Sequence, residues 1–139
     1  MIRKSVVLPL SPMAAFELFT QRIDEWWPPD RRHAQGASST IFMLRSGRFY
    51  ERTPQGHEVE LGRVRSWDSP RQILLDFFIA TGPENPTEVE ITFHPLANST
   101  EVIVTHRPTP ASADAWDQKA PSYGQSWEAV LLALSRAGA

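Results

Sequence analysis

The chain of 139 residues contains no cysteine. This absence excludes disulfides, thiolate nucleophiles, iron–sulfur ligation and zinc sites built from cysteine. The four histidines are not paired at the i, i+3 or i, i+4 spacing of a helical metal site; they are His33, His57, His94 and His106. We therefore expect neither a metal nor a cofactor.

The sequence also lacks an excess of charge of either sign and lacks a long apolar run. Its formal net charge is -2, so the composition gives no reason to expect binding to nucleic acid. No stretch predicts a membrane span, and the apolar part of residues 1–10 is too short for a signal peptide. We expect a single domain over residues 1–139, located in the cytoplasm, as a monomer or a homodimer.

A helical stripe near the C-terminus is the clearest pattern that is present. Apolar residues spaced for one face of a helix are Tyr123, Trp127, Val130, Leu131 and Leu134. Pro121 precedes this segment, Ser122 can cap it, and Gly138 follows it. We predict a long helix over residues 122–137, with a loose helical turn that carries Trp116 before it.

The residues before this helix read mostly as strands. Strands are predicted over residues 2–10, 41–45, 48–53, 58–67, 73–79, 87–93 and 100–107. Two short helices follow the first strand, one started by Ser11 and Pro12 and one containing Ile23 and Trp27. Residues 28–40 are polar and predict an exposed loop. Apolar residues occur on both parities of residues 73–79, which favours a strand covered on two sides.

One predicted strand contains an irregularity. Val59 and Leu61 share one parity, whereas Val64 has the other, and Gly62 lies between them. A bulge at Gly62 would shift the register and bend the strand. The pattern therefore predicts an α+β fold in which a curved antiparallel sheet of about seven strands wraps around the long C-terminal helix.

This order of elements resembles the helix-grip proteins of the START and birch-pollen-allergen superfamily, called SRPBCC. More narrowly, the chain is similar to the branch named after the activator of heat-shock protein 90 ATPase. The resemblance spans nearly the whole chain, and the segments that carry it are residues 12–20, 25–28, 47–51, 62–64, 67–71 and 86–89, with Ser126, Trp127 and Leu134. It implies a helix-grip fold with the order β-α-α-β6-α.

The resemblance also implies a cavity between the sheet and the C-terminal helix, suited to an apolar ligand. In this sequence the side chains in position to line it are Trp27, Phe49, Trp67, Phe77, His106, Tyr123 and Trp127. Such bulky rings can also fill the space they surround, so an open pocket and a filled core both remain alternatives. We expect the helix to touch a ligand through Tyr123 and Trp127, while Val130, Leu131 and Leu134 form plain core.

Two polar residues have the parity of inward-facing positions. His106 shares its parity with Val102 and Val104; a core histidine held by one hydrogen bond is the simpler interpretation, and an acid or base beside a ligand is the alternative. Glu51 shares the parity of Phe49. We expect it to form a structural ion pair with an arginine of a neighbouring strand, such as Arg48, Arg63 or Arg65, and we include it among the ligand-binding candidates.

Three functions follow from these observations. The first is a small non-enzymatic protein that binds a hydrophobic small molecule under the terminal helix. The second is a protein-interaction module with a chaperone as its partner, as the family name suggests. The third is an enzyme similar to the aromatase and cyclase members of the superfamily, working with His106 or Glu51.

Overall fold

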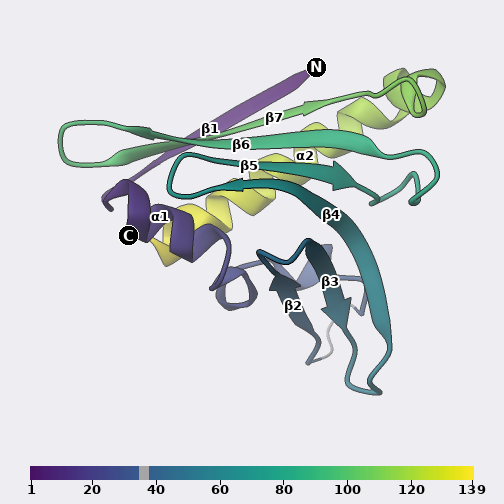
Figure 1. Cartoon of the computed structure of the whole chain (residues 1–139), viewed down its shortest axis with the longest axis horizontal. Coiled ribbons are helices and arrows are strands. Elements are labelled where there is room, and N and C mark those ends of the chain that lie inside the picture. The colour runs from purple at the N-terminus through teal and green to yellow at the C-terminus, as the bar shows by residue number, and fades with distance from the viewer. Residues whose placement is uncertain (35–37) are drawn as a thin grey trace.

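A seven-stranded antiparallel sheet curls around one long helix (Figure 1). The computed structural model of the chain describes residues 1–34 and 38–139. The strands are β1 (Ile2–Leu8), β2 (Thr40–Met43), β3 (Arg48–Arg52), β4 (Glu58–Asp68), β5 (Gln72–Phe77), β6 (Thr87–Pro95) and β7 (Thr100–Arg107), in the sheet order β1-β7-β6-β5-β4-β3-β2. The helices are α1 (Pro12–Phe19) and α2 (Ala113–Ala137), with two 3-10 turns, η1 (Ile23–Glu25) and η2 (Pro29–Arg31). The predicted α+β helix-grip fold is confirmed.

The boundaries of several elements differ from the sequence-based ones. The second short helix is the single turn η1, and η2 lies within the expected loop over residues 28–40, of which residues 35–37 lie outside the described residues. Strand β5 ends at Phe77, and its outward side chains are half-buried, so the predicted coverage on two sides is wrong. The positive φ of Ala80, 70°, belongs to the turn that follows.

Alternation of apolar and polar side chains forms the central strands. In β6 and β7 every second residue is buried, and their inward rows meet across the sheet, as in the register pair Ile91 and Val104. Burial of one complete face fixes this register, because a shift by one residue would turn the apolar row to water.

Strand β4 bends, as the irregular alternation around Gly62 predicts. Its register slips opposite Phe49 and Tyr50 and slips again between Val64 and Ser66. A Cβ atom at Gly62 would lie 2.4 Å from the carbonyl oxygen of Asp76, so only glycine lets β4 and β5 approach this closely. Figure 1 shows the result: β4 runs beside β5 and then turns away with β2 and β3.

Helix α2 is longer than predicted and runs through Pro121. The sequence-based start at Ser122 is wrong, and residues 113–120 form regular helix instead of a loose turn. The packing of Trp116 outweighs the helix-breaking signal of Pro121. The Trp116 ring lies 5.2 Å from His106 and 5.9 Å from Tyr123, and these contacts hold residues 113–120 against the sheet. No helix among the described residues has the length and apolarity to cross a membrane.

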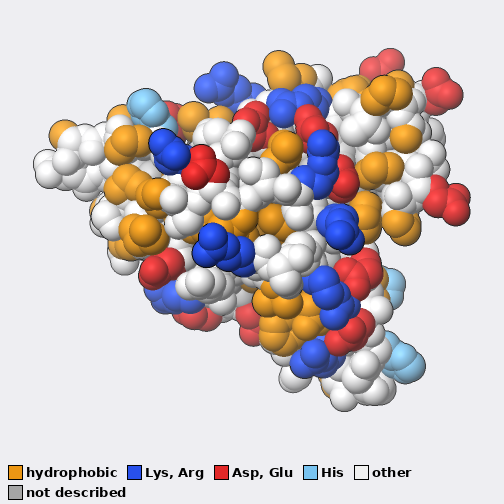
Figure 2. Space-filling model, in the orientation of Figure 1, with side chains coloured by type: hydrophobic (Ala, Val, Ile, Leu, Met, Phe, Trp, Pro, Cys, Tyr) orange, Lys and Arg blue, Asp and Glu red, His pale blue; other side chains and the backbone are white. Residues whose placement is uncertain are grey.

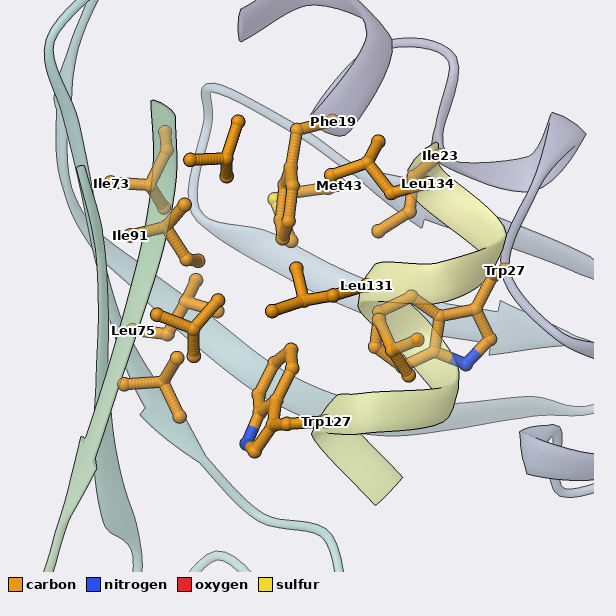
Figure 3. Close-up of a cluster of buried hydrophobic side chains, with 14 of the residues drawn as sticks. Phe19, Ile23, Trp27, Met43, Ile73, Leu75, Ile91, Trp127, Leu131 and Leu134 are labelled. Atoms are coloured by element: carbon orange, nitrogen blue, oxygen red, sulfur yellow. The ribbon is translucent and has the colours of Figure 1, made fainter. Parts of the chain in front are cut away.

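The second half of α2 is the centre of the core. Figure 3 shows Leu131 and Trp127 pointing from α2 towards Ile73, Leu75 and Ile91 of the sheet. All five side chains are at most 4% exposed. The predicted helical stripe is confirmed, since each of its members is buried.

The outer face of the sheet carries paired charges. Figure 2 shows Lys and Arg side chains interspersed with Asp and Glu on the side of the molecule drawn there. Arg48 contacts Glu58 and Glu60, and Arg107 contacts Glu88 and Glu90. Exposed pairs of this kind contribute little to stability individually, so this face is a solvated surface.

Candidate functional site

An apolar hollow of about 110 Å³ lies between the middle of α2, residues 123–130, and the sheet. Its lining residues are Trp27, Arg31, Phe77, Ile79, Tyr123, Ser126, Trp127 and Val130. We call it the inner hollow. Its volume is close to that of an apolar cavity that holds a single benzene ring, about 150 Å³. The aromatic side chains therefore fill much of the space that the fold provides but leave room for one ring.

A second hollow of about 350 Å³ adjoins the inner one. This outer hollow is lined by Asp30, Arg31, Arg32, His33, Val59, Glu60, Leu61, Phe78, Ile79 and Ala80. Arg31 and Ile79 line both hollows, so these two side chains lie between the two spaces. The outer volume lies in the range of small-molecule sites, about 300–1,000 Å³.

Four predicted site residues come together in the inner hollow: Trp27, Phe77, Tyr123 and Trp127. Trp127 meets Trp27 edge to face at 6.3 Å and lies 5.8 Å from Phe77. The Tyr123 hydroxyl donates a 2.7 Å hydrogen bond to the carbonyl oxygen of Ile79, which fixes α2 to the segment after β5. Burial raises the pKa of Tyr123, so this hydroxyl keeps its proton and remains a donor.

His106 lies directly behind this aromatic wall and is fully buried. Its ring is 4.3 Å from Tyr123 and 5.2 Å from Phe77. The Trp127 indole Nε1, which can only donate, gives a 3.0 Å hydrogen bond to His106 Nδ1. The proton of the neutral ring is therefore on Nε2, which donates to Thr87 Oγ1 at 2.7 Å.

Both ring nitrogens of His106 are thus occupied. Burial lowers the pKa of His106 to about 3 from 6.5, and the positive N-terminus acts in the same direction. The ring is neutral at physiological pH and has no free lone pair with which to take a proton from a ligand. This geometry favours the structural interpretation of His106, with two hydrogen bonds where the sequence suggested one.

Glu51 is fully buried, as its parity indicates, but the expected ion pair with an arginine is wrong. Its carboxylate accepts hydrogen bonds from the backbone N–H groups of His33, at 2.7 Å, and Ala34, at 2.8 Å. Strand parity gives the direction of a side chain but cannot show that a loop distant in sequence supplies the donors. Glu51 therefore holds the segment that walls the outer hollow and does not itself line it.

Arg32 fixes the same segment from the other side. Its guanidinium donates to the Asp24 carboxylate at 2.7 Å and to the backbone carbonyl oxygens of Asp24, Trp27 and Ser39. The same Asp24 oxygen accepts the N–H of Ile41, so the edge strand β2 is tied to η1. These contacts give the outer hollow a rigid wall.

The remaining two predicted residues lie elsewhere. Phe49 is buried behind Trp27, with the ring centroids 6.1 Å apart, and does not line either hollow. Trp67 packs on Phe16 at 5.3 Å and lines a separate hollow of about 290 Å³ at the α1 end of the sheet. The bends of β4 separate this end from the middle of α2.

Sequence reasoning missed four lining residues: Arg31, Ile79, Ser126 and Val130. The helix contained a usable signal for two of them, because Tyr123, Ser126 and Val130 follow the i, i+3, i+7 spacing of one face. Val130 was expected to be plain core; it is buried and also borders the hollow. Ile79 shares the parity of Phe77 in the predicted strand over residues 73–79, which was a usable signal, whereas Arg31 belongs to the predicted loop and carried none.

The described residues contain no group of three or more His, Asp or Glu side chains placed to hold a metal ion. The polar groups in the lining of the inner hollow include the Arg31 guanidinium and the hydroxyls of Ser126 and Tyr123.

Two solved structures share the fold at about a quarter sequence identity. CalC, a self-sacrificing resistance protein from Micromonospora echinospora, is 26% identical, with a TM-score of 0.73; the match covers 97% of this chain and 91% of CalC. Txn09, an anthrahydroquino-γ-pyrone synthase whose structure is complexed with SUM, is 25% identical, with a TM-score of 0.61; the match covers 97% of this chain and 94% of Txn09. CalU16 from Micromonospora echinospora is 14% identical, with a TM-score of 0.64; the match covers 96% of this chain and 70% of CalU16. At this identity the likeness shows the fold alone.

These structures correct one expectation. The expectation of a non-enzymatic protein is wrong, because Txn09 is a synthase and CalC is a self-sacrificing resistance protein. Proteins of this fold at this similarity therefore include an enzyme, the synthase Txn09. A comparison with curated proteins gives no match.

A family profile covers nearly the whole chain. Residues 9–137 match the profile described as Activator of Hsp90 ATPase homolog 1-like protein, a branch of the SRPBCC helix-grip proteins. The match runs from the end of β1 to the end of α2 and so includes both hollows. The chain belongs to the Activator of Hsp90 ATPase homolog 1-like family.

Proposed function

We propose that the protein binds a small, flat, largely apolar molecule that enters through the outer hollow and places one ring in the inner hollow. The single observation that carries this proposal is that Arg31 and Ile79 belong to the linings of both spaces. The inner space is walled by aromatic rings, which suit a flat apolar group. The outer space has the volume for the remainder of the molecule.

The comparisons support the same ligand class. The name of Txn09, an anthrahydroquino-γ-pyrone synthase, denotes fused aromatic rings, and its structure is a complex with SUM. An aromatic molecule of more than one ring matches a hollow that admits one ring and opens into a larger space. The remaining expectations from the sequence stay as predictions: one domain over residues 1–139, in the cytoplasm, as a monomer or a homodimer.

Two half-buried serines on α2 allow a matched test. Ser126 lines the inner hollow, whereas Ser135, nine residues further on, lines a surface depression beside β1. The probe is N-phenyl-1-naphthylamine, a neutral dye whose fluorescence rises in apolar surroundings. Ser126→Phe should weaken its binding by about tenfold or more, equal to about 1.4 kcal/mol, because the new ring occupies the space. Ser135→Phe should bind the dye as the unmodified protein does.

Absence of dye binding, or equal binding by Ser126→Phe, would contradict the proposal. Thermal unfolding of both variants shows whether they are folded. If Ser126→Phe does not fold, Ile79→Phe fills the hollow from the opposite wall and takes its place.

A second candidate is an enzyme that acts on the ligand in the same hollow, and the similarity to Txn09 favours it. Since both nitrogens of His106 are occupied and Glu51 is bonded to the backbone, the charged or hydroxyl-bearing side chains in the lining are Arg31, Ser126 and Tyr123, whose hydroxyl already donates to Ile79. Such a site would fold and orient a substrate rather than transfer its protons. Product formation from a poly-β-ketone substrate should cease in Ser126→Phe; unchanged turnover there would place any reaction elsewhere.

A chaperone partner is a third candidate, and the family match favours it. Stimulation of the ATPase of Hsp90 by the purified protein tests it directly. A rate equal to that of Hsp90 alone would remove this candidate without affecting the ligand site.

A further inference from the structure

Arg31 occupies the junction of the two hollows. It is the last residue of η2 and its backbone N–H bonds to the carbonyl oxygen of Pro28, at 3.1 Å. Its exposed side chain lines both the inner and the outer space. Among the residues that the structure describes, it is the one ionised side chain in the lining of the inner hollow. A molecule in the inner hollow therefore has this guanidinium as a neighbour.

The charged neighbours of Arg31 are mostly engaged with other groups. Arg32 is paired with Asp24 at 2.7 Å, and Glu60 is paired with Arg48 on the outer face. Asp30 precedes Arg31 and lines only the outer hollow. Within residues 1–34 and 38–139, Arg31 forms no ion pair. The inner hollow therefore has a cation at its mouth and, among these residues, no anion in its lining.

The chemistry of these groups selects an acidic ligand. A guanidinium presents parallel N–H donors that match the two oxygens of a carboxylate, and its pairing strengthens where apolar walls exclude water. The aromatic rings that line the inner hollow accommodate only the flat apolar part of the ligand. Ser126, which also lines the inner hollow, carries a hydroxyl that can donate to the same group.

We propose that the ligand is an aromatic carboxylate, with its ring in the inner hollow and its carboxylate on the guanidinium of Arg31. This inference rests on the proposed binding function. It adds that the ligand is negatively charged and that Arg31 recognises this charge. A cationic ligand would bring its charge towards Arg31 without a counter-charge in the described inner lining. A neutral ligand of the same shape would gain the ring contacts but not the ion pair.

Two probes of equal shape separate the contribution of the ring contacts from that of the ion pair. 2-Naphthoate and 2-naphthamide share the ring system and differ in charge, and calorimetry at about 20 mM salt keeps the ion pair unscreened. The unmodified protein should bind 2-naphthoate about fivefold more tightly than 2-naphthamide, the effect of one partly exposed ion pair. Arg31→Gln should bind the two probes with about equal affinity, because the ion pair is lost.

A matched control is Arg45→Gln, because Arg45 is an exposed arginine that lines the separate hollow near Trp67. This variant should keep the preference for 2-naphthoate. Arg31→Lys should keep part of it, since the charge remains and the planar fork is lost. About 500 mM salt should reduce the preference in the unmodified protein.

Each other outcome is decisive. Equal binding of the two probes by the unmodified protein would overturn the acidic ligand while the binding function stands. A preference that survives in Arg31→Gln would overturn the role of Arg31. If neither probe binds the unmodified protein, the proposed function itself fails, and the acidic ligand with it.

Discussion

The indole Nε1 of Trp127 donates a 3.0 Å hydrogen bond to Nδ1 of His106, between a helix and a strand whose bonded residues lie 21 positions apart in the sequence. This bond fixes the orientation of a ring that forms one wall of the inner hollow. His106 therefore acts on the site through Trp127, as a positioning residue rather than a ligand contact. Its own position is secured by the second bond, to Thr87.

A double-mutant cycle on these two residues should reveal the coupling. Trp127→Phe removes the donor to His106 Nδ1, and His106→Leu removes the partner of the Trp127 indole and of the Thr87 hydroxyl, so each should lower the free energy of unfolding by about 1–3 kcal/mol or more. The double variant should lose less than the sum of the two, because neither polar group of the pair remains. Urea unfolding of the four proteins gives the values, and strict additivity would contradict the bond.

Stability should depend on pH through His106. The unfolded chain binds a proton at this ring below about pH 6.5, whereas the folded protein, with a pKa of about 3, does not. The unfolded state therefore binds more protons between these values, and stability falls as the pH falls through this window, by up to about 1.4 kcal/mol per pH unit.

The control for this prediction is His106→Asn, which cannot titrate. Urea unfolding at pH 6.5 and pH 5 should show a steeper loss for the unmodified protein than for the variant. Only the two slopes are compared, so a lower baseline stability of the variant does not matter. Parallel slopes would mean that His106 is protonated in the fold as readily as in the unfolded chain.

Replacing the buried carboxylate of Glu51 should loosen the wall of the outer hollow. Glu51→Gln keeps one acceptor oxygen and turns an amide NH₂ towards a backbone N–H, so unfolding should become easier by about 2 kcal/mol. Amide hydrogen exchange at His33 and Ala34, whose N–H groups Glu51 binds, should accelerate. Glu101→Gln, at a half-buried carboxylate on β7, is the control and should change neither measurement.

Two glycines should respond to alanine in opposite directions. A Cβ at Gly62 would meet the Asp76 carbonyl oxygen at 2.4 Å, so Gly62→Ala must separate β4 from β5 and should destabilise the protein by about 2 kcal/mol or more. In α2, a Cβ at Gly124 would have no neighbouring atom within 4 Å, so Gly124→Ala should stabilise the protein by about 0.5–1 kcal/mol. Thermal unfolding compares the two, and a loss in both would contradict the geometry at Gly124.

The sequence predicted the fold well where one face of an element is completely buried. Alternation in β6 and the stripe from Tyr123 to Leu134 each allow one orientation, so local pattern and final structure agree. Pro121 misled the prediction, since the packing of Trp116 outweighs the missing backbone hydrogen bond. Local signals carry no information on such distant contacts.

Only part of the site could be predicted from the sequence, because local patterns carry no information on distant contacts. Phe77, Tyr123 and Trp127 lie on regular elements, and their direction follows from periodicity. Arg31 reaches the hollow from a connection without a period. Trp67 was assigned to the wrong end because two register slips in β4 change the course of the strand beyond Gly62.

Pro121 divides α2 into two hydrogen-bonded parts. Because the ring nitrogen carries no proton, the backbone carbonyl four residues earlier loses its helical partner, and the helix is two hydrogen-bonded ladders joined at one turn. The longer ladder holds Leu131 and Leu134, on which folding depends; the shorter one holds Trp116, which supports Tyr123 from behind. Because Trp116 also belongs to the hydrophobic core, its substitution is expected to change the aromatic wall and the stability of the core together.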